Sequence, residues 1–375
     1  MEYPRQITAI QAAAILISTI IGVGVLPLPL FAVRDGNSGA PLLTLLGGII
    51  AYIGIWIITK LGIRFPRQSI ILYSEAVLGK WTAWIGNVLI IGFFAFLTAL
   101  AAREFGEVVI TSVLKRTPLE VTVIVMLLMA SLSSRNDMTT FAYIHHFYLP
   151  LIVFPIVLIL ALSLKNAQFI NLLPVWGNEP SPTDMWRGVL TIAALFQGSF
   201  VYTMVIPAMR RPDRAMVAGF WGVFIAGGLY VSTVIAAVGV FGPAETNNLL
   251  WPTLELAKAT SLPGNILERL DAAFLAVWVT AVFTTLFSTY YFTIHAMSRF
   301  FRLRDHKLLA PFILPFLFAL AMVPQNVVQM YDIIAIAGRL GLLITIVYPL
   351  IVLLVAVIRK KRGDAGNGKD AENAS

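Results

Sequence analysis

Long apolar runs recur throughout this chain of 375 residues and constrain its fold more than any other feature. About 20 consecutive apolar residues cross a bilayer as a helix, and each backbone polar group must then find a partner inside the protein. Hydrophobic residues make up 58% of the chain and charged residues only 12%, which is too apolar for one water-soluble core. The sequence therefore predicts an all-α, polytopic membrane protein.

Charged residues and clusters of Pro, Asn and Gly divide the apolar runs into ten predicted transmembrane helices. Their approximate limits are 7–33, 41–63, 82–113, 117–134, 141–164, 186–209, 215–241, 269–298, 308–323 and 334–358. We expect a single transmembrane domain over residues 1–358. The charged segment 359–375, rich in Gly, Ala and Asn, is expected to be a disordered cytoplasmic tail.

Basic residues between the spans set the predicted orientation, because Lys and Arg near span ends are held on the cytoplasmic side. With both termini inside, eighteen Lys and Arg residues lie on the cytoplasmic side and seven on the opposite side. Both termini are therefore predicted to be cytoplasmic. The net charge of +8 is distributed between apolar runs, which fits membrane orientation better than a nucleic-acid-binding face.

The side chains that enzymes and metal sites need are sparse. The chain has no cysteine, and its four histidines show no zinc-type spacing. A nucleophile paired with a base is also not apparent in the sequence. We expect neither an enzyme nor a bound metal or cofactor.

The first predicted span is interrupted near its middle by two glycines and two prolines, Gly22, Gly24, Pro27 and Pro29. Pro27 has no amide hydrogen and crowds the carbonyl of Val23, so carbonyls near Gly22 and Val23 lose their helical partners. Lipid cannot replace those partners at this depth. The sequence predicts a broken helix beside a cavity; a glycine seam for close helix packing, with a proline kink, is the alternative.

A second polar, glycine-containing segment, Gln197-Gly198-Ser199, lies at mid-depth in the sixth predicted span. Spans one and six are five apart in a set of ten, which is the relation expected of an inverted repeat, here about 7–164 and 186–358. Paired interruptions of this kind indicate a solute site near the membrane centre. The sequence thus predicts a transporter-type architecture in which helices 1 and 6 are broken.

Other candidate lining residues lie at the same predicted depth. They are hydroxyls of span eight and apolar side chains of spans three and six: Thr284, Thr285, Thr289, Phe93, Leu97 and Phe196. Thr285 and Thr289 share one helix face at i,i+4. Bonding of the hydroxyls to their own helix carbonyls, and ordinary packing for the span-three side chains, are the alternatives.

Two charges lie within the outer third of span three. Arg103 and Glu107 can pair at i,i+4, and charges inside a membrane are functional candidates by default. We regard them as candidate gating residues; interaction with span ten through Arg339 is an alternative role. A purely structural ion pair is the open alternative.

Six motifs occur in order along the chain: IGVGVLPLP at 21–29, LGKW at 78–81, REFGEV at 103–108, RTP at 116–118, NLLPVWG at 171–177 and LWPTLEL at 250–256. In these motifs the chain resembles the spore germination permeases, the B subunits of nutrient germinant receptors of endospore-forming bacteria, within the amino-acid/polyamine permease superfamily. One position departs from that family. Its members often carry an acidic residue two positions after the glycine of span six, where this chain has Phe200.

The resemblance implies a LeuT-like 5+5 inverted repeat, with a germinant such as an amino acid bound at the broken helices. It also implies a complex with the A-type membrane subunit and the C-type lipoprotein, in the spore inner membrane. Two functions remain open, a germinant sensor and, as the alternative, a secondary active amino-acid transporter, because both use this fold. For an amino acid, amides from Gly22 to Val25 are expected to bind the carboxylate. Carbonyls before the break, Gln197 and the span-eight hydroxyls are expected to bind the ammonium group.

Overall fold

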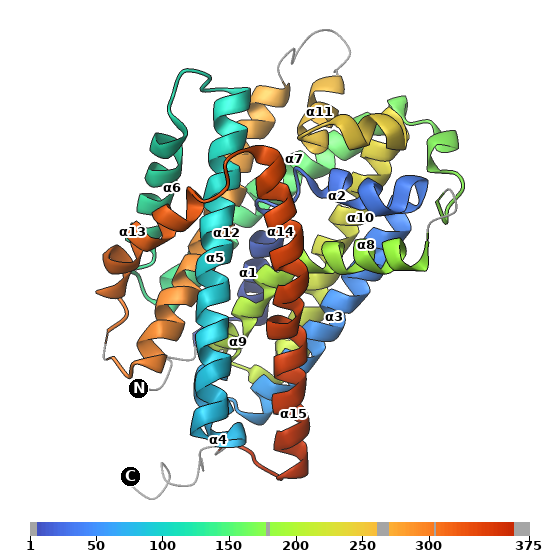
Figure 1. The fold of residues 1–375 in the computed structure, drawn as a ribbon. Helices are drawn as coiled ribbons and strands as arrows, with labels where there is room; N and C mark the ends of the chain where they lie inside the picture. The colour runs from blue at the N-terminus through green and yellow to red at the C-terminus, as the bar shows by residue number, and fades with distance from the viewer. Residues whose placement is uncertain (1–5, 178–180, 261–269, 304, 364–375) are drawn as a thin grey trace, which may run out of the picture.

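The computed structural model describes residues 6–177, 181–260, 270–303 and 305–363. Over these residues the chain is a bundle of helices without β-strands, apart from one isolated bridge between Ile7 and Met209 (Figure 1). Helix α1 (Ala9–Ile21) lies in the middle of the bundle, and its residues from Ala14 to Ile21 are all buried. The all-α prediction is confirmed for the described residues.

The other elements follow α1 in chain order. They are α2 (Leu28–Gly36), η1 (Asn37–Gly39), α3 (Ala40–Arg64), α4 (Ile70–Leu78), α5 (Lys80–Ser112), α6 (Leu119–Ser133), α7 (Met138–Ser163), η2 (Leu164–Asn166), η3 (Phe169–Leu172), α8 (Pro182–Ala194), η4 (Gln197–Val201), α9 (Tyr202–Val205), η5 (Ile206–Ala208), η6 (Pro212–Arg214), α10 (Ala215–Asn248), α11 (Pro252–Ala259), α12 (Leu270–Phe300), α13 (Leu309–Ala321), α14 (Val327–Leu342), the π-helical turn η7 (Leu343–Val347) and α15 (Tyr348–Ile358). The sequence analysis missed α4, and the last span begins at Val327 instead of at 334.

Six helical segments among the described residues are long and apolar enough to cross a membrane. The segment from α8 through η5, bent by 45°, makes a seventh if the bent pair is one span. Three shorter apolar helices, α1, α6 and α13, fall below the length of a full span, α1 because its helix breaks at Gly22. The polytopic membrane protein is confirmed, whereas the count of ten spans stays a prediction.

The first break occupies residues 22–27. Helix α1 begins with a capping box, in which Thr8 and Gln11 bond to each other's backbone amides, and it ends at Ile21. Gly22 then leaves helical geometry, with φ −53° and ψ −98°, and α2 begins after Pro27. The predicted interruption at Gly22–Gly24 is confirmed and reaches three residues further.

The second break follows α8. The α-helix ends at Ala194, and after Leu195 and Phe196 the chain continues as η4, a turn of 3₁₀-helix over Gln197–Val201. Such tightly wound turns are common where helices end or bend. The predicted interruption at Gln197–Ser199 is therefore confirmed, but the α-helix stops earlier and the segment itself is wound as a 3₁₀-helix.

Two of the basic clusters that were predicted to be cytoplasmic meet at one end of the bundle. The guanidinium of Arg64, at the end of α3, donates from Nε to the Lys361 carbonyl at 2.6 Å. Arg359, after α15, donates from Nη1 to the carbonyl of Val77 in α4 at 3.1 Å. These contacts place the chain after α15 beside the ends of α3 and α4. Residues 364–375 of the predicted tail lie outside the described residues.

Candidate functional site

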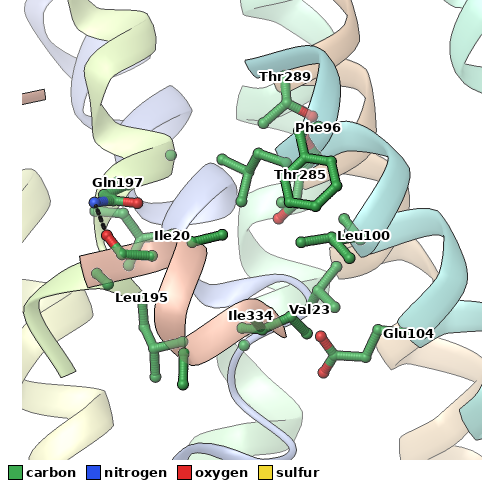
Figure 2. A pocket seen from close by; sticks show the side chains of 18 of the residues that line it. Ile20, Val23, Phe96, Leu100, Glu104, Leu195, Gln197, Thr285, Thr289 and Ile334 are labelled. Carbon is green, nitrogen blue, oxygen red and sulfur yellow. Dashed lines mark hydrogen bonds between the residues drawn. The ribbon is translucent and has the colours of Figure 1, made fainter. Parts of the chain in front are cut away.

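A cavity of about 80 Å³, here called the central cavity, lies between the two breaks and helices α5, α12 and α14. The sequence analysis predicted many of its lining residues, namely Val23, Gly24, Phe93, Leu97, Gln197, Gly198, Thr285 and Thr289. Figure 2 shows Val23 of the first break, Gln197 of η4 and, from α12, Thr285 and Thr289 converging on it. Side chains far apart in the sequence thus form one small, mostly apolar compartment.

The remaining predicted ligand residues support the wall of the central cavity instead of lining it. A Cβ added at Gly22 would lie 1.7 Å from Thr285 Oγ1, so the glycine permits close contact between the first break and α12. Thr284 Oγ1 donates to the Ser18 carbonyl at 3.1 Å. Phe196 packs edge-on against Tyr230, with ring centroids 5.0 Å apart.

Side chains from neighbouring helices donate to the backbone carbonyls around the first break. The bonds are Thr285 Oγ1 to Thr19 at 2.9 Å, Tyr230 Oη to Ile20 at 2.5 Å, Trp278 Nε1 to Gly22 at 3.2 Å and Thr253 Oγ1 to Val25 at 2.7 Å. Neighbouring protein thus replaces the missing helical partners, as a membrane requires. The carbonyls expected to receive a ligand ammonium group already accept hydrogen bonds.

A buried polar chain behind the central cavity connects α1, α7 and α12. Ser18 Oγ lies 2.6 Å from His145 Nδ1, and His145 Nε2 lies 3.0 Å from Ser288 Oγ. Ser288 Oγ in turn lies 2.6 Å from Thr19 Oγ1. The sequence analysis assigned no site role to His145, because its partners are distant in the chain. It ties the helix before the first break to the two helices behind it.

Two acceptor oxygens at the central cavity have no hydrogen-bond partner among the described residues. Gln197 donates from Nε2 to the Gly338 carbonyl at 2.7 Å, while its Oε1 is buried without a donor. Glu104 is only 4% exposed, and its Oε1 is also unpartnered. Figure 2 places these two side chains on opposite sides of the cavity. The sequence analysis missed Glu104 and the α14 segment from Ile334 to Gly338 that completes the lining.

The two predicted gating residues form the ion pair that their spacing indicates. Arg103 Nη2 lies 2.7 Å from Glu107 Oε1, and both side chains are buried. Arg103 also donates to the carbonyl of Ala321 in α13 at 3.4 Å. Arg339 does not join them; it donates to Thr191 Oγ1 at 2.9 Å. The pair therefore links α5 to α13, and its role in gating stays a prediction.

A second, more open hollow of about 380 Å³, here called the charged vestibule, adjoins the central cavity. Its lining residues are Phe31, Arg34, Asp35, Arg187, Thr191, Asp332, Ala335, Ile336 and Arg339. Phe31, Thr191 and Ala335 line both spaces. Arg187 pairs with Asp35 at 2.6 Å, and Arg34 lies 3.9 Å from Asp332. The vestibule is thus lined by charges of both signs and shares part of its wall with the central cavity.

Comparison with known protein families identifies the family. The family model described as "Spore germination protein" matches residues 6–330. The chain belongs to this spore germination family. Its relatives include spore germination protein YndE of Bacillus subtilis (strain 168), 27% identical over 95% of this chain and 98% of that protein. Spore germination protein A2 of the same organism is 26% identical over 96% of this chain and 98% of its own length.

A solved structure supports the fold of this family member. The crystal structure of MhsT in complex with L-phenylalanine matches with a TM-score of 0.66, covering 96% of this chain and 91% of MhsT at 14% identity. At that identity the match shows the fold alone. The predicted LeuT-like class with two broken helices is confirmed. Family and fold together define a membrane protein of the germinant-receptor or permease type.

Proposed function

We propose that the chain is the germinant-binding membrane subunit of a spore nutrient germinant receptor and that it binds an amino acid or similar small solute in the central cavity. The observation that carries this proposal is the cavity between two helix breaks, lined by residues of both breaks. Broken helices that border a solute site near the membrane centre are the arrangement expected of this architecture.

The cavity suggests how binding becomes a signal. Val23 and Gly24 line it from the break that precedes α2, and the N-terminus of a helix carries a partial positive charge that favours a ligand carboxylate. Gln197 and Gly198 line it from η4. A ligand that contacts both breaks at once favours the helix arrangement in which they are close, and partner subunits would detect the shifted population.

The assembly around this subunit belongs to the same proposal. Relatives named spore germination proteins A2 and B2 support a role in germination, and hence a complex with an A-type membrane subunit and a C-type lipoprotein in the spore inner membrane. The basic ends of α3 and α15 support a cytoplasmic location for both termini. We further propose one transmembrane domain over residues 1–358, made of inverted repeats at about 7–164 and 186–358.

The second candidate function is secondary active transport of an amino acid. The fold shared with MhsT, whose structure contains L-phenylalanine, favours it, as does the charged vestibule that adjoins the cavity. A transporter must open the same site to each side in turn, whereas a sensor needs only one binding-linked change.

Binding and uptake, measured together, separate the two functions. The purified full chain in proteoliposomes is tested with the twenty radiolabelled L-amino acids. Saturable binding without uptake supports the sensor, and concentrative uptake contradicts sensing as the sole function. Gly24→Ala adds a methyl group at the cavity with its nearest contact at 3.4 Å, so it should weaken binding. Gly92→Ala is the matched control, because a Cβ there meets nothing within 4 Å.

A further inference from the structure

Glu104 is a buried carboxylate at the central cavity for which the described protein provides no counter-charge. Among the residues that line the cavity it is the one with an ionisable carboxyl group, and no lining residue is basic. Figure 2 shows its carboxylate projecting from α5 toward Val23 and Ile334. Removing such a group from water is costly unless a cation or several donors replace the solvent.

The basic side chain next to Glu104 in sequence is already engaged. Arg103 donates from Nε to Glu107 Oε1 at 2.9 Å and holds that carboxylate in the ion pair of 2.7 Å. Glu107 therefore has the partner that Glu104 lacks, although both lie on α5 and are similarly buried, at 6% and 4% exposure. Because Arg103 compensates the charge of Glu107, the carboxylate of Glu104 is the one without a counter-charge.

The neighbouring phenol groups do not supply a donor either. Tyr230 Oη donates to the Ile20 carbonyl at 2.5 Å, and Tyr331 Oη donates to the Leu250 carbonyl at 2.8 Å. Protonation of Glu104 would remove the buried charge, but Oε1 would still have no hydrogen-bond partner among the described residues. A positively charged donor inside the cavity satisfies the carboxylate.

We propose that Glu104 binds the ammonium group of the ligand, an inference that rests on the proposed site in the central cavity. The ligand class is then a small solute with a primary ammonium group directed toward α5, and a solute whose only charge is negative is disfavoured. Gln197 Oε1, on the opposite side of the cavity, accepts a second donor from the ligand. Family members often carry an acidic residue at the position of Phe200 in η4. In this chain Glu104 of α5 would provide a carboxylate from a different helix.

The test compares each amino acid with its 2-hydroxy analogue, in which a hydroxyl replaces the ammonium group, on the full chain in lipid nanodiscs. Glu104→Gln should weaken binding of the amino acid about 10- to 100-fold, which is the range for a hydrogen bond between charged groups, and leave the hydroxy acid unchanged. Glu75→Gln is the control, because Glu75 pairs with Arg302 on an exposed surface and neither residue lines the cavity. Equal amino-acid affinity in Glu104→Gln and wild type would overturn the inference and leave the proposed site intact.

A ligand-independent probe covers the case in which no amino acid binds. Ethylammonium chloride should raise the Tm of the wild type more than sodium chloride does at equal ionic strength, and this difference should vanish in Glu104→Gln. Together with the absence of amino-acid binding, that result would support the inference while contradicting amino-acid sensing. An equal response of both proteins would overturn the inference. If Glu104→Gln does not fold, the wild type decides, because failure to prefer ethylammonium over sodium would also overturn it.

Discussion

The two helix breaks solve the same problem in opposite ways. At the first break, side chains from α10, α11 and α12 donate to backbone carbonyls between Thr19 and Val25. At the second, the 3₁₀ turn η4 keeps its own local bonds, and the Gln197 amide makes one bond to α14 while its oxygen stays unpartnered. The first break receives its hydrogen bonds from neighbouring helices, whereas the hydrogen bonds of the second lie mainly within its own turn.

This difference assigns the breaks different tasks. A segment held by several neighbouring helices has a single arrangement, because moving it leaves many buried polar groups unpaired at once. A segment with few outside hydrogen bonds leaves fewer buried polar groups unpaired when it shifts, and an unpartnered acceptor can bind a donor of the ligand. The first break therefore acts as the fixed wall of the central cavity, and the second break is the part expected to respond to a ligand.

The largest expected effect comes from Gly22→Ala. The added Cβ would lie 1.7 Å from Thr285 Oγ1 and 2.6 Å from the Ala281 backbone oxygen, so α12 or the break must move. We expect a loss of about 3 kcal/mol of stability, at the upper end for an overpacked core. Thermal unfolding in detergent measures it. Gly24→Ala is the matched control, and equal Tm values for the two variants would show that the first break is not a fixed wall.

A smaller effect is expected from Thr285→Val, which keeps the side-chain shape but removes the donor to the Thr19 carbonyl. Losing one partner of a buried hydrogen bond should cost about 1–2 kcal/mol. Thr289→Val is the matched control, because the Thr289 hydroxyl bonds to carbonyls of its own helix and lines the same cavity. Its cost should stay below about 0.5 kcal/mol. A larger loss for Thr289→Val would contradict the external support of the first break.

How well the sequence predicted each part depends on how local its chemistry is. Gly22, Gly24 and Pro27 lie close together and all disfavour a continuous helix, so the first break was predicted correctly. Gln197-Gly198-Ser199 also marked the second break, but its 3₁₀ winding and the earlier end at Ala194 depend on packing against α1 and α14. Helix breaks are local features, whereas their exact geometry is set by tertiary contacts.

The missed lining residues carried no local signal. The α14 segment from Ile334 to Gly338 consists of Ile, Ala and Gly and has no polar side chain. Only its position beside Gln197 in the structure shows that it lines the cavity. Glu104 was overlooked because the i,i+4 spacing of Arg103 and Glu107 explained the charges of α5 without it. When a membrane helix carries apolar residues on all its faces, the sequence does not indicate which face borders a cavity.

The smallest expected effect on stability comes from Gln197→Met at the second break. The substitution removes the bond from Nε2 to the Gly338 carbonyl and also the buried, unpartnered Oε1. Because these two changes oppose each other, the free energy of unfolding should change by less than about 1 kcal/mol. Ligand affinity should nevertheless fall by about 5-fold, the equivalent of one hydrogen bond of about 1 kcal/mol. Thermal unfolding with and without ligand measures both quantities on one sample.

The stability and the ligand affinity of Gln197→Met together show whether the second break differs from the first in its response to a ligand. A variant that is as stable as wild type but binds more weakly places Gln197 at the responsive break, in contrast to Thr285→Val, whose main cost is stability. If Gln197→Met instead loses as much stability as Gly22→Ala, the bond to α14 anchors the second break as firmly as side chains anchor the first. The ligand would then have to act on a rigid cavity, and movement would have to arise in α14 or α5 instead of in η4.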